Sequence, residues 1–150
     1  MTDPLSPSLV LVPVDGSEES LSAVEYATAV AAEYDARIHA LYVVGEDLAR
    51  AIGTGAVDDQ TLAADTEAFL EAVADIVAEA GVPLSTSMTH GFSTARLSRH
   101  PGSVVLDTAE EVDADFLVVP REPVSGDPDE VLGKAAEYVL LYASQPVLSV

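Results

Sequence analysis

Asp15, Gly16 and Ser17 are the first residues of the chain whose types and placement suggest chemistry. They directly follow Leu9–Val14, an uninterrupted apolar run. At the end of a strand Asp15 offers a carboxylate to a ligand, and the glycine lets the backbone turn sharply beside it. The same residues also fit a plain strand-to-helix turn in which Ser17 caps the helix. The sequence leaves both interpretations open, a ligand contact and a capped turn.

The histidines and serines give little support for a catalytic or metal site. His39 lies in an apolar segment and is expected to be packed or edge-exposed. His90 and His100 flank a loop, but without the fixed helical spacing that strengthens the case for a metal site. Neither Ser93 nor Ser103 lies in a G-x-S-x-G motif, and the absence of cysteine excludes thiolate metal sites and thiol redox chemistry. We therefore predict no catalytic residue and no bound metal.

Alternating strand and helix patterns must position these residues. The predicted strands are Leu9–Val14, Arg37–Val44, Leu84–Thr89, Phe116–Val119 and Pro146–Val150. The predicted helices are the segment from the Ser17 cap to Tyr34–Asp35, then Asp58–Ala80, Ser103–Val112 and Val131–Tyr142. This alternation indicates an α/β fold with a parallel sheet and helices on both faces. Ligands of such folds bind beyond the carboxyl ends of the strands, where the strand order reverses.

Proline and glycine mark the ends of these elements. Pro13 cannot donate to a strand ladder, so we place it at a strand end. Gly81 fits a helix C-cap, and Pro83 follows it. The segments 45–57, 90–102 and 121–130 contain glycine or proline among polar residues and are predicted to be loops.

Composition bounds the function classes. A chain of 150 residues that is 49% hydrophobic is expected to fold as one domain, residues 1–150, and not to be disordered. Its 26 acidic residues outnumber 6 basic ones, which gives a net charge of -20. Because affinity for nucleic acid rests on cationic contacts to phosphate, we expect no nucleic acid partner. Acids spread along the chain, with Lys134 the single lysine, suggest a halophilic source; an ordinary acidic protein is the alternative.

The chain shows no pattern that would send it to a membrane. Met1–Pro7 lacks a basic region followed by an apolar run, so no signal peptide is predicted. No apolar stretch approaches the roughly 20 residues of a membrane span. We therefore expect a cytoplasmic protein without a membrane partner.

Several segments together resemble the universal stress protein family, in the family's order and over nearly the whole chain. They are Val12–Glu18, Ala36–Val44, Ala114–Val119, Leu132–Gly133 and Gln145–Val150. The resemblance implies a Rossmann-like five-stranded sheet in the order 3-2-1-4-5, with Asp15 and Pro120 at one crevice. It also implies a frequent homodimer through the last strand, here Pro146–Val150, which would be an unpaired apolar edge.

Many members of this family bind ATP through a Gly, two residues, Gly, nine residues, Gly, then Ser or Thr. Glycine lets backbone N–H groups approach the phosphates. The corresponding positions here are Pro120, Pro123, Gly133 and Lys134. Proline has no N–H, and two lost hydrogen bonds of about 1.5–3 kcal/mol each would weaken triphosphate binding about a hundredfold to ten-thousandfold. Lys134 and Arg121 would offset part of this loss.

The residues at the adenosine half of the family's ATP site are retained better than those at the phosphate half. The resemblance implies that Pro13, Val14 and Asp15 after the first strand, and Val43 at the end of the second, hold the adenosine. The leading hypothesis is a stress-response protein that acts by binding and dimerisation, with a degenerate ATP site and no turnover. The alternative is a regulatory protein that holds AMP or ATP in the residual adenosine pocket. The third, a slow ATPase, is disfavoured by the missing glycines.

Overall fold

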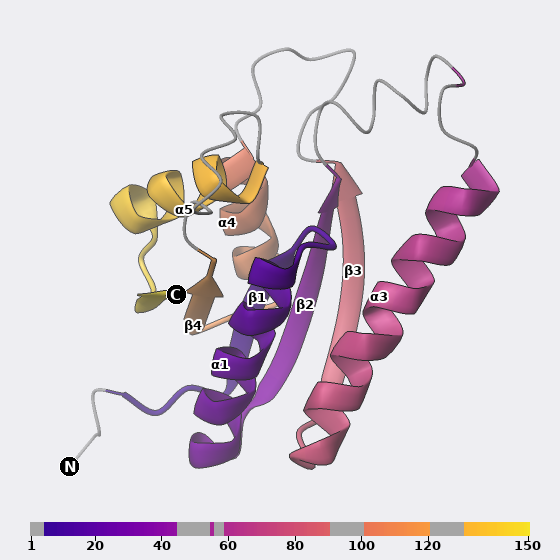
Figure 1. Ribbon diagram of the computed structural model, residues 1–150. Helices are drawn as coiled ribbons and strands as arrows, with labels where there is room; N and C mark the ends of the chain where they lie inside the picture. Colours follow the sequence, from indigo (N-terminus) through magenta and orange to yellow (C-terminus); the bar gives the residue numbers. More distant parts are fainter. Residues whose placement is uncertain (1–4, 45–54, 56–58, 91–100, 121–130) are drawn as a thin grey trace.

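The computed structural model describes residues 5–44, 55, 59–90, 101–120 and 131–150. Strands and helices alternate along these residues (Figure 1). The elements are β1 (Leu9–Val14), α1 (Glu18–Tyr34), β2 (Arg37–Val44), α3 (Asp59–Glu79), β3 (Leu84–His90), α4 (Pro101–Glu111), β4 (Phe116–Val119), α5 (Val131–Tyr142) and β5 (Val147–Ser149). The strands form a parallel five-stranded sheet in the order β3-β2-β1-β4-β5, which confirms the predicted α/β fold and sheet order.

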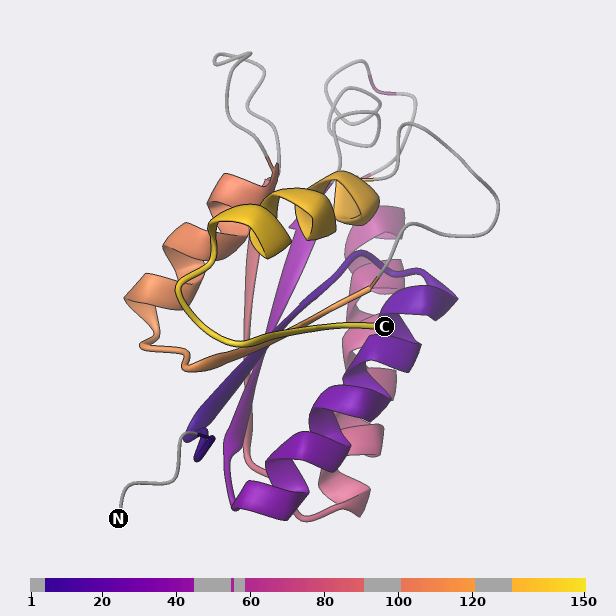
Figure 2. The same ribbon diagram turned by 90° about the vertical axis from the view of Figure 1, so that its left-hand side faces the viewer.

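The sheet separates two hydrophobic cores, because successive side chains of a strand point to opposite faces. Helices α1 and α3 cover one face, and α4 and α5 cover the other (Figures 1 and 2). In β1, Val10, Val12 and Val14 pack under α1 and α3, whereas Leu9 and Leu11 pack under α4 and α5. Every residue of β1 and β4 is buried, as expected for central strands covered on both faces.

The helix ends follow the predicted capping residues. Ser17 has an extended backbone, and its hydroxyl accepts a hydrogen bond from the Ser20 N–H at 3.2 Å, which caps α1. Gly81 follows α3 with φ +71°, and its N–H donates to the Ala78 carbonyl at 2.9 Å. A left-handed glycine after the last turn is a frequent way to end a helix, so the predicted C-cap is confirmed.

Several element boundaries differ from the predicted ones. His90 was assigned to a loop, but β3 continues through it and pairs it with Val44. Pro101 was also assigned to a loop, but α4 begins there rather than at Ser103. Proline is tolerated in a first helical turn because its missing N–H would have no partner there. The last strand is shorter than predicted, and the segments 45–57 and 121–130 lie, apart from Gly55, outside the described residues.

None of the helices, within the residues that the structure describes, is long and apolar enough to cross a membrane.

Candidate functional site

The strand order reverses between β1 and β4, and their pairing stops early. The two strands pair at Val10–Phe116 and Leu11–Leu117, whereas β1 continues to pair with β2 as far as Val14. Beyond this point β4 pairs with β5 on its other side. Such a reversal is where ligands of open α/β sheets bind. Asp15 and Pro120 follow these two strands directly, so both predicted residues lie at the carboxyl end of the reversal point.

The same arrangement explains why a proline is tolerated near the end of a central strand. Backbone groups of a strand face its two neighbours in turn. The Ser8 carbonyl accepts from the Arg37 N–H at 3.0 Å on the β2 side, and the Leu9 carbonyl accepts from the Asp115 N–H at 3.1 Å on the β4 side. The backbone groups of Pro13, like those of Leu9, face the β4 side. The pairing between β1 and β4 ends at Leu11, before Pro13. Its missing N–H therefore removes no ladder bond.

Asp15 takes part in the turn that starts α1. Its Oδ1 accepts hydrogen bonds from the Ser17 backbone N–H at 3.0 Å and from the Ser17 hydroxyl. The capped-turn interpretation of this segment is therefore confirmed. Among the described residues no hydrogen bond reaches Asp15 Oδ2, so one carboxylate oxygen at the end of β1 can still accept a bond from a ligand.

Gly16 cannot be replaced without strain, because Tyr42 lies directly over it. Gly16 has φ +89°, and a Cβ there would lie 2.9 Å from the Tyr42 hydroxyl oxygen. That hydroxyl also donates to the Asp15 carbonyl at 3.4 Å. Burial raises the pKa of the Tyr42 phenol, and the Asp15 carboxylate adds to the increase. The phenol is therefore a neutral hydrogen bond donor beside the turn that follows β1.

Sequence reasoning missed Tyr42, although one signal was available. Tyr42 carries a polar hydroxyl near the end of β2, and it pairs with Val14 in the register of β1 and β2. A tyrosine in a central strand usually needs a partner for its hydroxyl, and the register places the polar residues after β1 beside it.

The residues predicted to contact adenosine differ in their exposure to solvent. Val14 and Val43 are both fully buried, and they belong to the cores on opposite faces of the sheet. Neither residue exposes side chain or backbone, so a direct contact with a ligand is not available to them in this arrangement. Pro13 and Pro120 are buried as well, so Asp15 is the partly accessible one among those predicted site residues whose burial the structure describes.

The phosphate half of the predicted site is mostly outside the described residues. Pro123 and Arg121 both fall in the segment 121–130, which the structure does not describe. Gly133 and Lys134 lie in the first turn of α5. Their placement at a helix start agrees with the expected position, but the use of these residues for phosphate stays a prediction.

The comparison with known proteins decides the family. The sequence matches the Universal stress protein family over residues 9–150. The chain belongs to the universal stress protein family. A universal stress protein of Methanocaldococcus jannaschii (strain ATCC 43067) is 31% identical over 146 residues, which cover 94% of this chain and 80% of that protein.

Solved universal stress proteins share the fold. One, in complex with cAMP, has a TM-score of 0.69 and 24% identity and aligns over 97% of this chain and 98% of its own. Another, from Archaeoglobus fulgidus in complex with dAMP, has a TM-score of 0.64 and 18% identity, with the same coverage of 97% and 98%. These similarities confirm the Rossmann-like fold of this universal stress protein.

His39 of this universal stress protein lies on the α4 face of β2, against side chains of β3. It is buried under the α4 face, where Nδ1 lies 2.7 Å from the Ser85 hydroxyl and Nε2 lies 2.8 Å from the Ser87 hydroxyl. Burial lowers the pKa of its imidazole, because a buried ring resists protonation. The prediction of a packed histidine is confirmed. The ring borders a cavity of about 320 Å³ that Asp107 and Glu111 of α4 also line.

Metal ligation finds no support in the part of the universal stress protein that the structure describes. No cluster of three or more histidine, aspartate or glutamate side chains there could hold a metal ion. Of the two histidines whose placement in the sequence was weak evidence for a metal site, His100 lies outside the described residues, and so does the side chain of His90.

Proposed function

We propose that this universal stress protein binds an adenine nucleoside monophosphate at the crevice after β1, and binds it more tightly than ATP. The observation that carries the proposal is the Asp15 carboxylate at the point where the strand order reverses. Ser17 holds its Oδ1, and no residue that the structure describes donates to its Oδ2. Two structurally similar members of the family were solved with cAMP and with dAMP. Of the hypotheses drawn from the sequence, these observations favour the nucleotide-binding one.

Charge and backbone chemistry support the preference for a monophosphate. A carboxylate accepts hydrogen bonds from ribose hydroxyl or adenine amino groups, and it repels phosphate. ATP brings further negative charge to a chain of net charge -20. Pro120 and Pro123 stand where ATP-binding relatives supply glycine N–H groups, so the terminal phosphates would lose donors that AMP does not need.

Calorimetry with AMP, cAMP and ATP tests this proposal, at both low and multimolar salt. We expect the monophosphate to bind in the micromolar range. ATP should bind at least about tenfold more weakly, which corresponds to a difference of about 1.4 kcal/mol. Asp15→Ala should abolish binding of the monophosphate. Ser17→Ala is the matched control, because it disturbs the same turn and keeps the carboxylate. Equal losses in both variants would assign Asp15 a structural role only.

A second pair of variants tests the phosphate end. Replacing Pro120 and Pro123 together by glycine restores the N–H groups, so ATP affinity should rise about tenfold or more while AMP affinity changes little. ATP binding in the parent protein as tight as AMP binding would contradict the proposal. If no adenine nucleotide binds, the result supports the other hypothesis, a stress-response protein that acts by binding and dimerisation without a nucleotide.

The proposal includes binding without turnover. Phosphate release from ATP should stay at background, with no difference between the parent protein and Lys134→Ala. A release rate that is above background and is lost with Lys134→Ala would instead support the slow ATPase.

We further propose that the protein forms a homodimer through β5 and the end of α5. The strand lies at one edge of the sheet. Three consecutive apolar residues at the end of α5 are exposed, namely Leu140 (54%), Leu141 (71%) and Tyr142 (65%). Contiguous exposed apolar groups mark interaction sites. Sedimentation should show a dimer at micromolar concentration that Leu141→Glu dissociates. Tyr26→Glu, at an exposed tyrosine of α1, should leave the dimer intact, and a monomeric parent protein would refute the proposal.

A further inference from the structure

Among the strands that the structure describes, β3 forms a long edge on the side of the sheet opposite β5. Among the described strands it pairs only with β2, in a continuous register from Leu84 to His90. Its sequence LSTSMTH contains no proline and no Asp, Glu, Lys or Arg. Sheet edges are normally protected against further pairing by short strands, charges, prolines or bulges. The opposite edge, β5, has only three residues, whereas β3 has seven.

The backbone of β3 leaves a defined set of groups open at this edge. The Ile38 N–H of β2 donates to the Pro83 carbonyl at 2.9 Å, so the backbone groups of Pro83 face β2. Residues at alternate positions face the other way. The N–H and carbonyl groups of Leu84, Thr86 and Met88 therefore point outward, where an added strand would bond to them.

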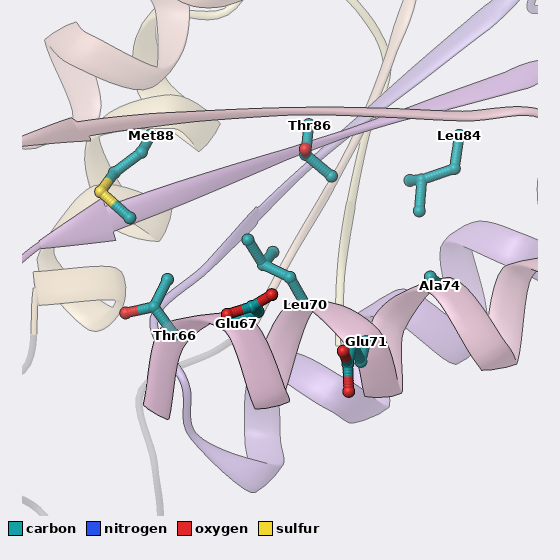
Figure 3. Close-up of a pocket in the computed structure, with 8 residues that line it drawn as sticks. All are labelled: Thr66, Glu67, Leu70, Glu71, Ala74, Leu84, Thr86 and Met88. Atoms are coloured by element: carbon teal, nitrogen blue, oxygen red, sulfur yellow. The ribbon is translucent and has the colours of Figure 1, made fainter. Parts of the chain in front are cut away.

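The side chains of the same residues border a groove. Leu84, Thr86 and Met88 extend from β3 toward α3, and Leu70 of α3 points back toward them (Figure 3). The space between them measures about 520 Å³. Met88 is 53% exposed although its register partner Tyr42 is buried. A strand added to β3 would thus place alternate side chains over an apolar surface that α3 does not cover.

The charge beside the groove indicates which kind of segment would bind there. Glu67 and Glu71 of α3 line the same groove, and both are exposed. They lie four positions apart, which places them one above the other on the same helix face. A second copy that docked symmetrically at this edge would bring its own Glu67 and Glu71 against the same two carboxylates. A segment that carries lysine or arginine would instead find two carboxylates beside an apolar floor.

We propose that the β3 edge and this groove bind an extended basic segment of another protein by strand addition. The main chain of the segment bonds to the outward groups of Thr86 and Met88. Its apolar side chains enter the groove beside Leu70, and its cationic side chains pair with Glu67 and Glu71. Main-chain bonds supply affinity in this mode of recognition, and the alternate side chains supply specificity.

A synthetic peptide that is as long as β3 and alternates valine with lysine is a suitable probe. NMR should show slower exchange of the Thr86 and Met88 amides when this peptide is added, and no such effect of a valine–glutamate peptide. Thr86→Pro removes an outward N–H without taking a bond from β2, so it should weaken peptide binding about tenfold. Thr86→Val keeps the N–H and is the matched control.

A charge test separates specific binding from general attraction to an acidic protein. Replacing Glu67 and Glu71 together by glutamine should weaken peptide binding at least about threefold, more than the same change at Glu25 and Glu33 of α1. Equal effects of the two double variants, or binding that Thr86→Pro leaves unchanged, would overturn the proposal. So would concentration-dependent protection of the Thr86 amide without peptide, because the occupant would then be a second copy. If Thr86→Pro does not fold, amide exchange in the parent protein decides alone.

Discussion

Gly16 satisfies two separate requirements at the junction between β1 and α1. Its backbone is left-handed, with φ +89°, and the Tyr42 hydroxyl occupies the space that a side chain would need. Gly16→Ala should therefore lower the free energy of unfolding by about 1–3 kcal/mol. In a Tyr42→Phe background the loss should be smaller, because the nearest atom to the new methyl group is gone. Urea denaturation of the four proteins measures both effects, and an identical loss in both backgrounds would assign the strain to the backbone alone.

His39 makes the stability of the protein depend on pH. Burial lowers the pKa of its imidazole in the folded state, whereas the unfolded value is about 6.5. The unfolded chain therefore binds a proton first as the pH falls. The contribution of His39 is complete above pH about 6.5 and is lost as the pH falls from there through the lower folded pKa.

The measurement compares urea denaturation of the parent protein and His39→Gln between about pH 7.5 and about pH 5.5. Glutamine keeps polar atoms near Ser85 and Ser87 but does not titrate in this range. The parent protein should lose stability over this interval more steeply than the variant. Parallel pH profiles would show that protonation of His39 does not contribute to the pH dependence of stability.

At the scale of elements, one carboxylate ties the start of β1 to the start of β4. Asp115 accepts hydrogen bonds from the Ser8 N–H at 2.9 and 3.0 Å and from the Leu9 N–H at 3.0 Å. Bonds to a charged acceptor are among the stronger ones, so Asp115→Asn should lower the free energy of unfolding by about 1–2 kcal/mol. Asp113→Asn is the matched control, because asparagine also adopts the left-handed backbone found there, φ 59°. Equal losses in the two variants would contradict the assigned role.

The elements that the sequence predicted well are those whose signals are local. The apolar runs of β1, β2 and β4 and the helix α5 have the predicted bounds, because burial on both faces and capping leave a clear pattern. His90 was missed because its pairing with Val44 is decided by the neighbouring strand. The turn at Asp15 was foreseen, but the hydroxyl of Tyr42 above Gly16 depends on strand register, which the sequence does not specify. The residues at the phosphate end of the site were predicted only from the family resemblance.

The whole molecule presents separate surfaces on one sheet. The nucleotide crevice proposed here lies at the carboxyl end of β1, the dimer surface at the β5 edge and the peptide groove at the β3 edge. Because β2 lies between β1 and β3, a nucleotide and a peptide would not compete for the same residues. What these surfaces share is that they belong to a chain with 26 acidic residues and a net charge of -20.

That charge makes salt the variable to which the whole molecule should respond. Raising KCl from about 0.1 M to about 1 M shortens the Debye length from about 10 Å to about 3 Å, which screens the repulsion within a chain of net charge -20. We expect the midpoint of urea denaturation to rise over this range, and to keep rising above it if the protein is adapted to high salt. A variant in which Glu67, Glu71, Asp75 and Glu79 of α3 are replaced by their amides should respond less. An ordinary acidic protein would reach a plateau by about 0.5 M, where exposed charges are already largely screened, and such a plateau would contradict the halophilic assignment.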